Sequence, residues 1–424
     1  MAKPPRIAFW GNFGTGNWGN ECTLQAIVHN AREWMPDAEL LCVCSEPTDT
    51  EKRHGLRSFP ISYVRRQVGG LGGAKRLPLP ARLLRRVWNE TIEWAKTVQI
   101  TRGLDAVVMT GTGMLTDDSE GAFGLPYDLF KWALAAKASG TRVLFASVGV
   151  EPIDSSIARF FIVNALRLAD YRSYRDGQSR DRLAKAGFTS EDDHVYPDLA
   201  FSLPRARGGD GPAAGAAPKI AVGVYNYVGR GQHDAAGATR YRDYLEKLAS
   251  FVMWLLERDY GVRVIIGDLT YDEAVVFDLR EVLRAKGVSR YGDRFVDQPA
   301  ASVDEVMRQI GEVEVVVASR FHNVLLALLL GKPVVSIAYN EKNDALMGQM
   351  GLAAYCQSID ALDLDRLIEQ FSDIRANAET LRAAISRKAA AYRGELDEQY
   401  RAVFAREPRA KHSDGERLDG TPAA

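Results

Sequence analysis

The sequence predicts an α/β protein of two doubly wound domains that face a cleft. Short β-branched runs alternate with longer amphipathic stretches through most of the chain, which favours parallel sheets covered by helices. At 424 residues the chain exceeds the roughly 250 to 300 residues at which a single hydrophobic core stops growing. The same alternation restarts after a stretch rich in Gly, Pro and Ala, so we expect one domain on each side of it.

Composition sets the boundaries of these domains. We place the first domain at residues 1–204, a linker at 205–218 (RARGGDGPAAGAAP) and the second domain at 219–372. The linker has almost nothing to bury, as is typical of a flexible connection. The segment 373–405 is rich in Ala and charged residues, which predicts C-terminal helices packing back across the domains. The polar segment 406–424 predicts a disordered tail.

Each domain contains its own series of strands and helices. In the first domain we expect strands at 6–10, 40–44, 105–110, 142–148 and near Tyr171, with helices at 21–34, 81–100, 127–138, 155–169 and 178–186. In the second domain we expect strands at 220–225, 263–266, 314–318 and 333–338, with helices between them.

The overall composition excludes several classes of protein. The 54 basic and 55 acidic residues nearly cancel, so bulk charge gives no sign of nucleic-acid binding. The longest apolar run, 324–330, is far shorter than the roughly 20 residues of a membrane span, and no signal peptide is evident. Four cysteines form no disulfide scaffold and no redox or zinc pair, which favours the cytoplasm. Cys42 and Cys44 resemble a metal pair with Cys22, but burial as small apolar residues is the favoured interpretation.

Two glycine-rich turns follow predicted strands of the first domain, GNFGTGNWGNE at 11–21 and GTGMLTDD at 111–118. The turn after a strand's carboxyl end is where open α/β sheets bind ligands, and glycine lets the backbone approach an anion or a sugar. A purely structural tight loop is the alternative. The candidate binding residues of the two turns are Asn12, Gly14, Asn17, Glu21, Gly111, Gly113 and Asp118.

A third turn, SRFHN at 319–323, joins an apolar strand to an apolar helix in the second domain. It places Arg320 and His322 at a helix N-terminus, where the helix dipole favours anions. A bound phosphate or carboxylate would compensate for two cations at this position. The alternative is a helix-capping histidine beside an arginine paired with a surface carboxylate.

Six segments together resemble the polysaccharide pyruvyl transferase family, in the family's order, over residues 7 to about 352. They are GNFGTGNWGNE, GTGMLTDD, YRSYRD (171–176), YPDLAFSL (196–203), SRFHNVLLALLLGKPVVSIAY (319–339) and NEKNDALMGQMGL (340–352). The resemblance implies a glycosyltransferase B-like fold of two Rossmann-like domains. It also implies transfer of a pyruvyl group from phosphoenolpyruvate to a sugar of a cell-surface polysaccharide or its lipid-linked precursor.

The resemblance also assigns roles to residues. Arg320 and His322 match the family's Arg-x-His element, implicated in holding phosphoenolpyruvate and protonating its methylene carbon. Arg175 matches a further donor-binding arginine, and Ser319 and Lys342 fall in the same donor-side segments. Phosphoenolpyruvate is then a co-substrate, and no cofactor is expected.

The chain departs from the family pattern at two positions. Asn20 replaces the usual acid just before Glu21. Tyr225, Asn226 and Tyr227 stand where the family commonly has an arginine, and the next arginine is Arg230. These departures leave the acceptor open.

Other functions remain open at this point. A nucleotide-sugar glycosyltransferase shares the expected architecture, with Glu341 or Asp344 as a possible ribose ligand, and a catalytically silent sugar-binding or assembly protein is also compatible. We expect no metal, and Asp117 and Asp118 are interpreted as loop caps. The segment 65–88 carries seven cations and no acid, which is typical of either peripheral membrane contact or a solvated helix.

Overall fold

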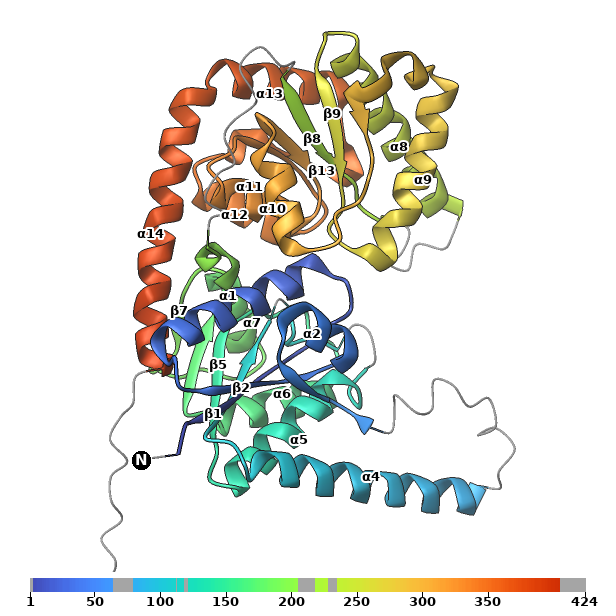
Figure 1. The fold of residues 1–424 in the computed structure, drawn as a ribbon. Helices are drawn as coiled ribbons and strands as arrows, with labels where there is room; N and C mark the ends of the chain where they lie inside the picture. Colours follow the sequence, from blue (N-terminus) through green and yellow to red (C-terminus); the bar gives the residue numbers. More distant parts are fainter. Residues whose placement is uncertain are drawn as a thin grey trace, which may run out of the picture.

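The computed structural model describes residues 3–63, 79–111, 113–117, 121–204, 218–227 and 235–404. Within these ranges the chain forms two parallel sheets, each flanked by helices (Figure 1). The predicted fold class is confirmed. Most of the basic segment, the linker, Asp118 and the predicted disordered tail lie outside the described residues.

The first domain contains a seven-stranded sheet in the order β3-β2-β1-β4-β5-β6-β7, with every neighbouring pair parallel. Its strands are β1 (Arg6–Gly11), β2 (Glu39–Cys44), β3 (Arg57–Pro60), β4 (Ala106–Thr110), β5 (Arg142–Val148), β6 (Tyr171–Tyr174) and β7 (His194–Val195). Its helices are α1 (Trp18–Trp34), α2 (Pro47–His54), α4 (Leu79–Thr101), α5 (Leu125–Ala138), α6 (Ser156–Arg167), α7 (Gly177–Lys185) and the 3-10 helix η2 (Leu199–Ser202).

The second domain repeats this plan with six parallel strands in the order β10-β9-β8-β11-β12-β13. Its strands are β8 (Lys219–Gly223), β9 (Gly261–Ile265), β10 (Phe295–Val296), β11 (Val315–Ala318), β12 (Val334–Ala338) and β13 (Cys356–Ser358). Its helices are α8 (Ala235–Leu256), α9 (Leu269–Ala285), α10 (Val303–Gly311), α11 (Phe321–Leu329) and α12 (Glu341–Gln349), with 3-10 helices η4 (Val288–Arg294), η5 (Ala353–Tyr355) and η6 (Ile359–Ala361).

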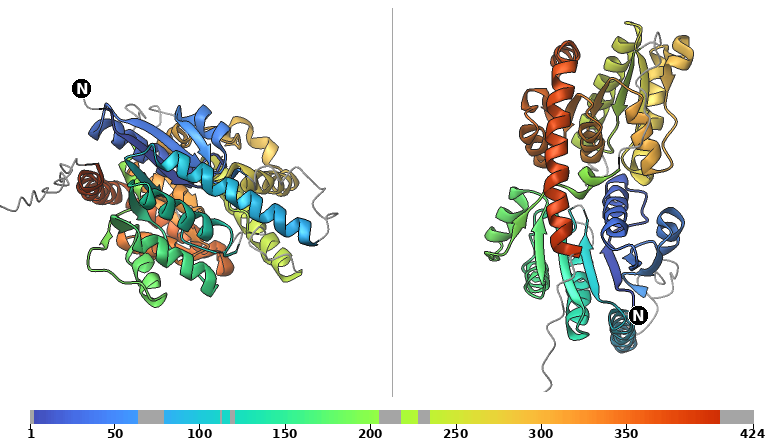
Figure 2. Two further views of the ribbon diagram at one scale, coloured as in Figure 1. Left: turned by 90° about the horizontal axis from the view of Figure 1, so that it is seen from below. Right: turned by 60° about the vertical axis from the view of Figure 1, so that its left-hand side comes forward.

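Two C-terminal helices complete the described chain, α13 (Leu364–Ala376) and α14 (Ala378–Phe404). Helix α14 runs down one side of both domains, as Figures 1 and 2 show. Its buried residues include Leu396 and Tyr400, which join α1, η2 and α11 in one apolar cluster. The C-terminal helices therefore pack back across the domains as expected.

The central strands form because their residues bury apolar side chains on both faces of each sheet. Strand β4 (AVVMT) and strand β11 (VVVA) are buried at every position, the pattern of a parallel sheet covered by helices. Cys22, Cys42 and Cys44 are free and buried in one apolar cluster, as their favoured interpretation predicted. Among the described helices, none has the length and apolar character needed to cross a membrane.

Candidate active site

A cavity of about 790 Å³ lies between the two domains, at the carboxyl ends of both sets of strands. The first domain lines it with the loops after β1, β4, β5 and β6, and the second domain with the loops after β9, β11 and β12. In both sheets the strand order reverses beside the first strand of the domain, and α/β proteins bind ligands at such switch points. The cavity is therefore the candidate active site.

Arg320 stands just before α11 on the second-domain wall of the cavity. Its Nη2 donates to Asp272 Oδ1 at 2.5 Å and its Nε to Asp272 Oδ2 at 2.9 Å. Asp272, on α9, is fully buried. Burial opposes the charge of Arg320, but Asp272 outweighs this effect and raises the pKa of the guanidinium. Arg320 is therefore paired with a carboxylate, as in the alternative interpretation of the sequence, but this carboxylate is buried and not on the surface.

His322 lies in the first turn of α11, and about nine-tenths of it is buried. Its Nε2 is 3.7 Å from Asp198 Oδ2 of the first domain, which is too long for a hydrogen bond. Both atoms are buried and neither has a hydrogen-bond partner. Burial raises the pKa of Asp198, but nearby His322 and Arg175 outweigh it and hold that pKa below its usual value. His322 thus lines the cavity, and its buried Nε2 makes no hydrogen bond within the protein.

Arg175 follows β6 and brings a second guanidinium to the cavity. It is 7% exposed, and its Nη1 is 3.7 Å from Asp198 Oδ2 while its Nε is 3.4 Å from Asp176 Oδ2. Burial opposes its charge, but the carboxylates of Asp198, Asp176 and Glu151 outweigh this and raise its pKa. Arg175 is therefore a permanent cation in the site.

Lys342, in the first turn of α12, contributes a third cation from the second domain. Its Nζ is 3.2 Å from Glu151 Oε1 in the loop after β5, so this ion pair crosses between the domains. Burial raises the pKa of Glu151, but Lys342 and Arg175 outweigh it and lower the pKa overall. Glu151 therefore remains ionised and holds Lys342 over the cavity.

Three glycines make room for these side chains. A Cβ at Gly19 would lie 2.5 Å from His322 Nδ1, and a Cβ at Gly149 would lie 2.7 Å from Arg175 Nη2. At Gly267 a Cβ would lie 2.6 Å from Arg320 Cγ. Real Cβ atoms do not approach other heavy atoms this closely. A side chain at any of the three would displace a cavity residue.

The structure brings together about half of the residues proposed from sequence. Those that line the cavity are Asn17, Gly113, Arg175, Arg320, His322 and Lys342. Asn17 caps α1 with its side-chain oxygen and donates its amide to Asp268 of the second domain at 2.9 Å, so it also joins the domains. Asp118 lies outside the described residues.

Within the first glycine-rich turn, Gly14 and Glu21 bond to other groups of the protein and do not line the cavity. Glu21 is fully buried, with Oε1 accepting from the Gly14 N–H at 2.9 Å and Oε2 lying 2.8 Å from His54 Nε2. The Gly19 N–H likewise donates to Asn17 Oδ1. The interpretation of Gly14 and Glu21 as ligand-binding residues is corrected, because their polar groups brace the loop.

Three further assignments are also corrected. Asn12 is exposed away from the cavity wall, where its Oδ1 accepts from Ser45 Oγ. Ser319 is fully buried behind the wall, and its carbonyl accepts from Asn343. Gly111 does not line the cavity, and its positive φ of 144° marks a sharp turn after β4. These residues shape the loops without reaching the cavity.

Four further residues that support the site were not predicted from the sequence. Asp198 and Glu151 face the cavity cations, Asp272 fixes Arg320, and Tyr339 lines the cavity. Tyr339 stacks on Tyr225 with ring centroids 4.1 Å apart, and Arg320 lies 4.7 Å from the centre of the Tyr225 ring. An aromatic pair thus stands beside Arg320.

Asp117 is the described member of the Asp117–Asp118 pair. Asp117 accepts from the backbone N–H groups of Asp154 at 3.3 Å and Ser155 at 2.7 Å, so it caps the loop before α6 as predicted. Within the described part of the chain, no group of three His, Cys, Asp or Glu residues is arranged to hold a metal ion.

Comparison with known proteins gives a family and a fold. The model of the polysaccharide pyruvyl transferase family matches residues 19–341. No curated protein matches the chain. Among solved structures, the chain resembles a putative UDP-N-acetylglucosamine 2-epimerase from Listeria monocytogenes, with a TM-score of 0.58 and 11% identity over 94% of this chain and 97% of that one.

It also resembles the UDP-GlcNAc 2-epimerase from Neisseria meningitidis, with a TM-score of 0.56 and 9% identity over 94% of this chain and 100% of that one. At such low identity these likenesses show the fold alone. They agree with the expected glycosyltransferase B-like arrangement of two Rossmann-like domains around a cavity.

Proposed function

This chain belongs to the polysaccharide pyruvyl transferase family, and we propose that it transfers a pyruvyl group from phosphoenolpyruvate to a sugar of a cell-surface polysaccharide or its lipid-linked precursor. The product would be a pyruvate ketal. One observation carries the proposal: Arg175, Arg320, Lys342 and His322 converge on a single cavity. Phosphoenolpyruvate bears a phosphate and a carboxylate, so it suits a cavity lined by these groups.

The cations have separate tasks in this proposal. Arg175 and Lys342 come from opposite walls and would bind the two anionic groups of the donor from both sides. Each charge-assisted hydrogen bond of this kind is worth about 1.5 to 3 kcal/mol. Arg320 keeps its pair with Asp272 and adds its remaining N–H groups.

His322 would act as the general acid, because its Nε2 is buried at the wall and has no hydrogen-bond partner. One acceptor hydroxyl adds to the enol carbon while the methylene carbon takes the proton from His322. A second hydroxyl of the same sugar then displaces the phosphate, and its proton goes to the departing phosphate. The proton lost by the first hydroxyl restores His322, and inorganic phosphate leaves. A positioned acid typically contributes about 10² to 10⁴-fold in rate.

Binding of the two possible donors tests the proposal. We expect calorimetry to show phosphoenolpyruvate binding to the full-length protein, and phosphate release when a sugar with suitable hydroxyls is added. Among the described residues of the second-domain wall, none is a carboxylate that could hold a ribose. Binding of a nucleotide sugar without phosphoenolpyruvate would overturn the proposal in favour of a glycosyltransferase. If neither donor binds, a catalytically silent protein becomes the better interpretation.

We expect the reaction to proceed without a metal ion and in the cytoplasm. Asp117, the described member of the Asp117–Asp118 pair, is engaged as a loop cap. Treatment with EDTA followed by gel filtration should leave phosphate release unchanged. A loss that Mg²⁺ or Mn²⁺ restores would contradict this and assign Asp117 and Asp118 a ligand role.

A further inference from the structure

The first domain carries an apolar surface that no described part of the protein covers. Six large apolar side chains form it, and we call it the apolar face. On α4, Leu84 is 72% exposed, Val87 66% and Trp88 67%. On and near α5 and α6, Phe123 is 68% exposed, Ile157 48% and Phe160 58%. Large exposed apolar side chains gathered in one place mark an interaction site more often than scattered ones.

Aromatic rings pack together on and near α5 and α6, and hydrogen bonds of Tyr127 connect this ring cluster to α4. Phe160 contacts Phe161 at 5.7 Å between ring centroids, and Phe161 contacts both Phe123 and Tyr127. The Tyr127 hydroxyl donates to Glu90 at 2.5 Å and accepts from Trp94 Nε1 at 3.1 Å, both on α4. The rings of α5 and α6 are therefore connected to α4 at Glu90 and Trp94, within two turns of Trp88.

Helix α4 is attached to α5 by buried and half-buried ion pairs. Near its attachment, the buried Lys131 of α5 lies within 4 Å of Glu90 and Glu93 on α4 and of Asp128 on α5. The outer turns of α4 project beyond the body of the domain (Figures 1 and 2). Leu84, Val87 and Trp88 are spaced i, i+3 and i+4, so they share one side of this projecting helix.

Charge indicates what kind of surface the apolar face contacts. Arg85 and Arg86 lie between Leu84 and Val87 in the sequence of α4, and neither is buried. Residues 65–88 of the sequence contain no acid, whereas they contain Arg65, Arg66, Lys75, Arg76, Arg82, Arg85 and Arg86. A helix with apolar and basic side chains matches an anionic lipid surface, and each basic residue there strengthens binding about five-fold.

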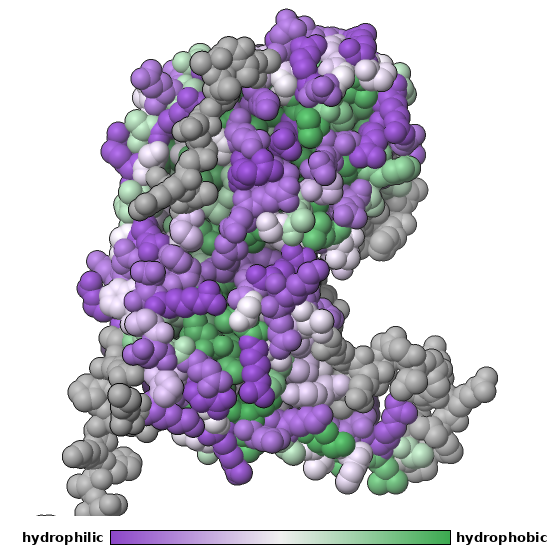
Figure 3. Space-filling view, in the orientation of Figure 1, coloured by the Kyte–Doolittle hydropathy of each residue, from purple (hydrophilic) through white to green (hydrophobic). Residues whose placement is uncertain are grey.

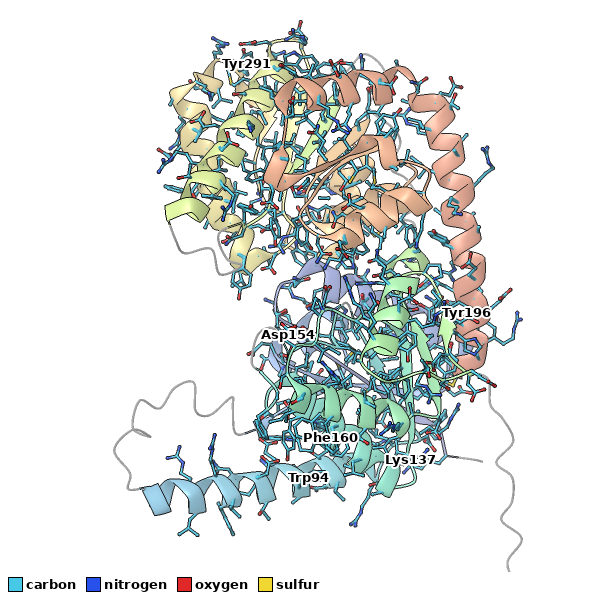
Figure 4. All side chains as sticks on the ribbon, turned by 180° about the vertical axis from the view of Figure 1, so that it is seen from behind. Trp94, Lys137, Asp154, Phe160, Tyr196 and Tyr291 are labelled. Carbon is cyan, nitrogen blue, oxygen red and sulfur yellow. The ribbon has the colours of Figure 1, made fainter. Side chains whose placement is uncertain are left out.

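The apolar face also adjoins the opening of the cavity. Asp154 and Ser155 line the cavity, and α6, which carries Ile157 and Phe160, begins at the next residue. Figure 4 shows Asp154, Phe160 and Trp94 in succession from the cavity down to α4. Figure 3 shows the molecular surface hollowed on the side toward which α4 projects.

We propose that the apolar face docks on an anionic membrane surface and so places the cavity opening beside an acceptor carried by a lipid. The docking stands on the exposed side chains and charges alone. The statement about the acceptor rests on the proposed function.

Co-sedimentation with vesicles tests the docking. At low salt we expect the full-length protein to bind vesicles of phosphatidylglycerol and phosphatidylcholine, and to bind pure phosphatidylcholine at least 10-fold less. Trp88→Ser and the double variant Arg85→Glu/Arg86→Glu should each weaken binding to the anionic vesicles about 10-fold or more. Phe277→Ser is the matched control, because Phe277 is 59% exposed on α9 of the other domain.

The vesicle experiment would contradict the docking if wild-type protein fails to bind anionic vesicles. It would also contradict the docking if Trp88→Ser protein binds them as well as wild type does. Sedimentation velocity gives a further test. A wild-type dimer that Trp88→Ser dissociates would overturn the docking and make the face a contact between two copies of the chain. Phosphate release with a soluble sugar separates this proposal from the proposed function. It should be equal in wild type and Trp88→Ser, and its failure in wild type would refute the transferase assignment without affecting vesicle binding.

Discussion

The two domains meet through two regions of opposite chemistry, an apolar seam and the polar cavity. In the seam, formed by α1, η2, α11 and α14, all nine residues of α11 are buried, and apolar side chains from both domains form one cluster. The cavity borders the same α11 at its first turn but collects Arg175, Arg320, His322 and Lys342.

The difference lies in where the unpaired polar groups of each region stand. Some polar groups of the seam pair within the protein, as Ser202 Oγ does at 2.7 Å from the Tyr400 hydroxyl. Trp18 Nε1 and the Asn323 amide in the seam have no hydrogen-bond partner, but these two residues do not line the cavity. In the cavity, His322 Nε2 and Asp198 Oδ2 are buried without a hydrogen-bond partner. Buried polar atoms are rarely left unpaired unless they serve a function. The seam therefore joins the two domains, and of these residues with unpaired atoms His322 is the one that lines the cavity.

The largest expected effect is that of Arg320→Ala. Arg320 combines a role in the cavity with a role in stability, because it lines the cavity and pairs with a buried carboxylate. Arg320→Ala would leave Asp272 charged and uncompensated in the interior, which typically costs about 3 to 5 kcal/mol. Urea denaturation should show this loss of stability in addition to weaker donor binding. Lys342→Ala is the control, since its partner Glu151 is only partly buried and the cost should be smaller. If Arg320→Ala has the same urea midpoint as wild type, the pair with Asp272 does not stabilise the fold and the role of Arg320 is limited to binding the ligand.

A substitution within the seam should affect stability without affecting chemistry. Leu325 is fully buried on α11, and Leu325→Ala should lower the free energy of unfolding by about 2 to 5 kcal/mol. Turnover per folded molecule should change little. Leu134→Ala, at a position 36% exposed on α5, is the control and should cost far less. A large loss of donor affinity in Leu325→Ala, with unchanged stability, would show that the seam also tunes the cavity.

His322 should show the opposite pattern. His322→Gln removes the proposed acid, so turnover should fall about 10²-fold or more while donor affinity and the unfolding midpoint stay close to wild type. Phosphate release and calorimetry measure the two effects separately. His54→Gln is the control, because His54 pairs with the buried Glu21 away from the cavity and should affect stability instead. Full turnover in His322→Gln would assign the acid to another residue.

The sequence predicted the central part of both sheets but missed their edges. A long buried strand such as β5 can be recognised from its apolar composition. Strands β3, β10 and β13 have only two to four residues each, which is too short for such a pattern. Edge strands bury less apolar surface and are recognised mainly by backbone pairing, which a sequence does not display. Helix α2 was missed as well, since six of its residues are exposed or half-buried and polar.

The same distinction applies to the site. Arg320 and His322 were predicted because they lie where an apolar strand passes into an apolar helix, whereas Arg175 and Lys342 were predicted from the resemblance to the family. Their partners were missed because they are distant in the sequence: Asp272 lies 48 residues before Arg320, and Glu151 lies 191 before Lys342. Glu21 was misassigned because a polar residue in a glycine-rich turn resembles a ligand-binding group. Only the fold shows that it points toward Gly14 and His54.

The smallest expected effect concerns Gly19, where the seam and the cavity meet. Gly19 begins the buried side of α1, yet a Cβ there would lie 2.5 Å from His322 Nδ1 and 2.8 Å from Cε1. Gly19→Ala must therefore shift the imidazole or separate the two helices slightly. Because α1 and α11 are locked by the seam, we expect the imidazole to move.

Misplacing a general acid by a fraction of an ångström should lower turnover about 10-fold, equivalent to about 1.4 kcal/mol in the barrier. Donor affinity should change little, because Arg175 and Lys342 are untouched. Gly394→Ala is the control: it lies inside α14 with no atom near a new Cβ, so it should leave turnover unchanged and raise stability by up to about 1 kcal/mol. If Gly19→Ala instead lowers stability and leaves turnover per folded molecule intact, the strain is absorbed by the seam. The helices of the seam would then move more easily than the His322 side chain, contrary to what their packing predicts.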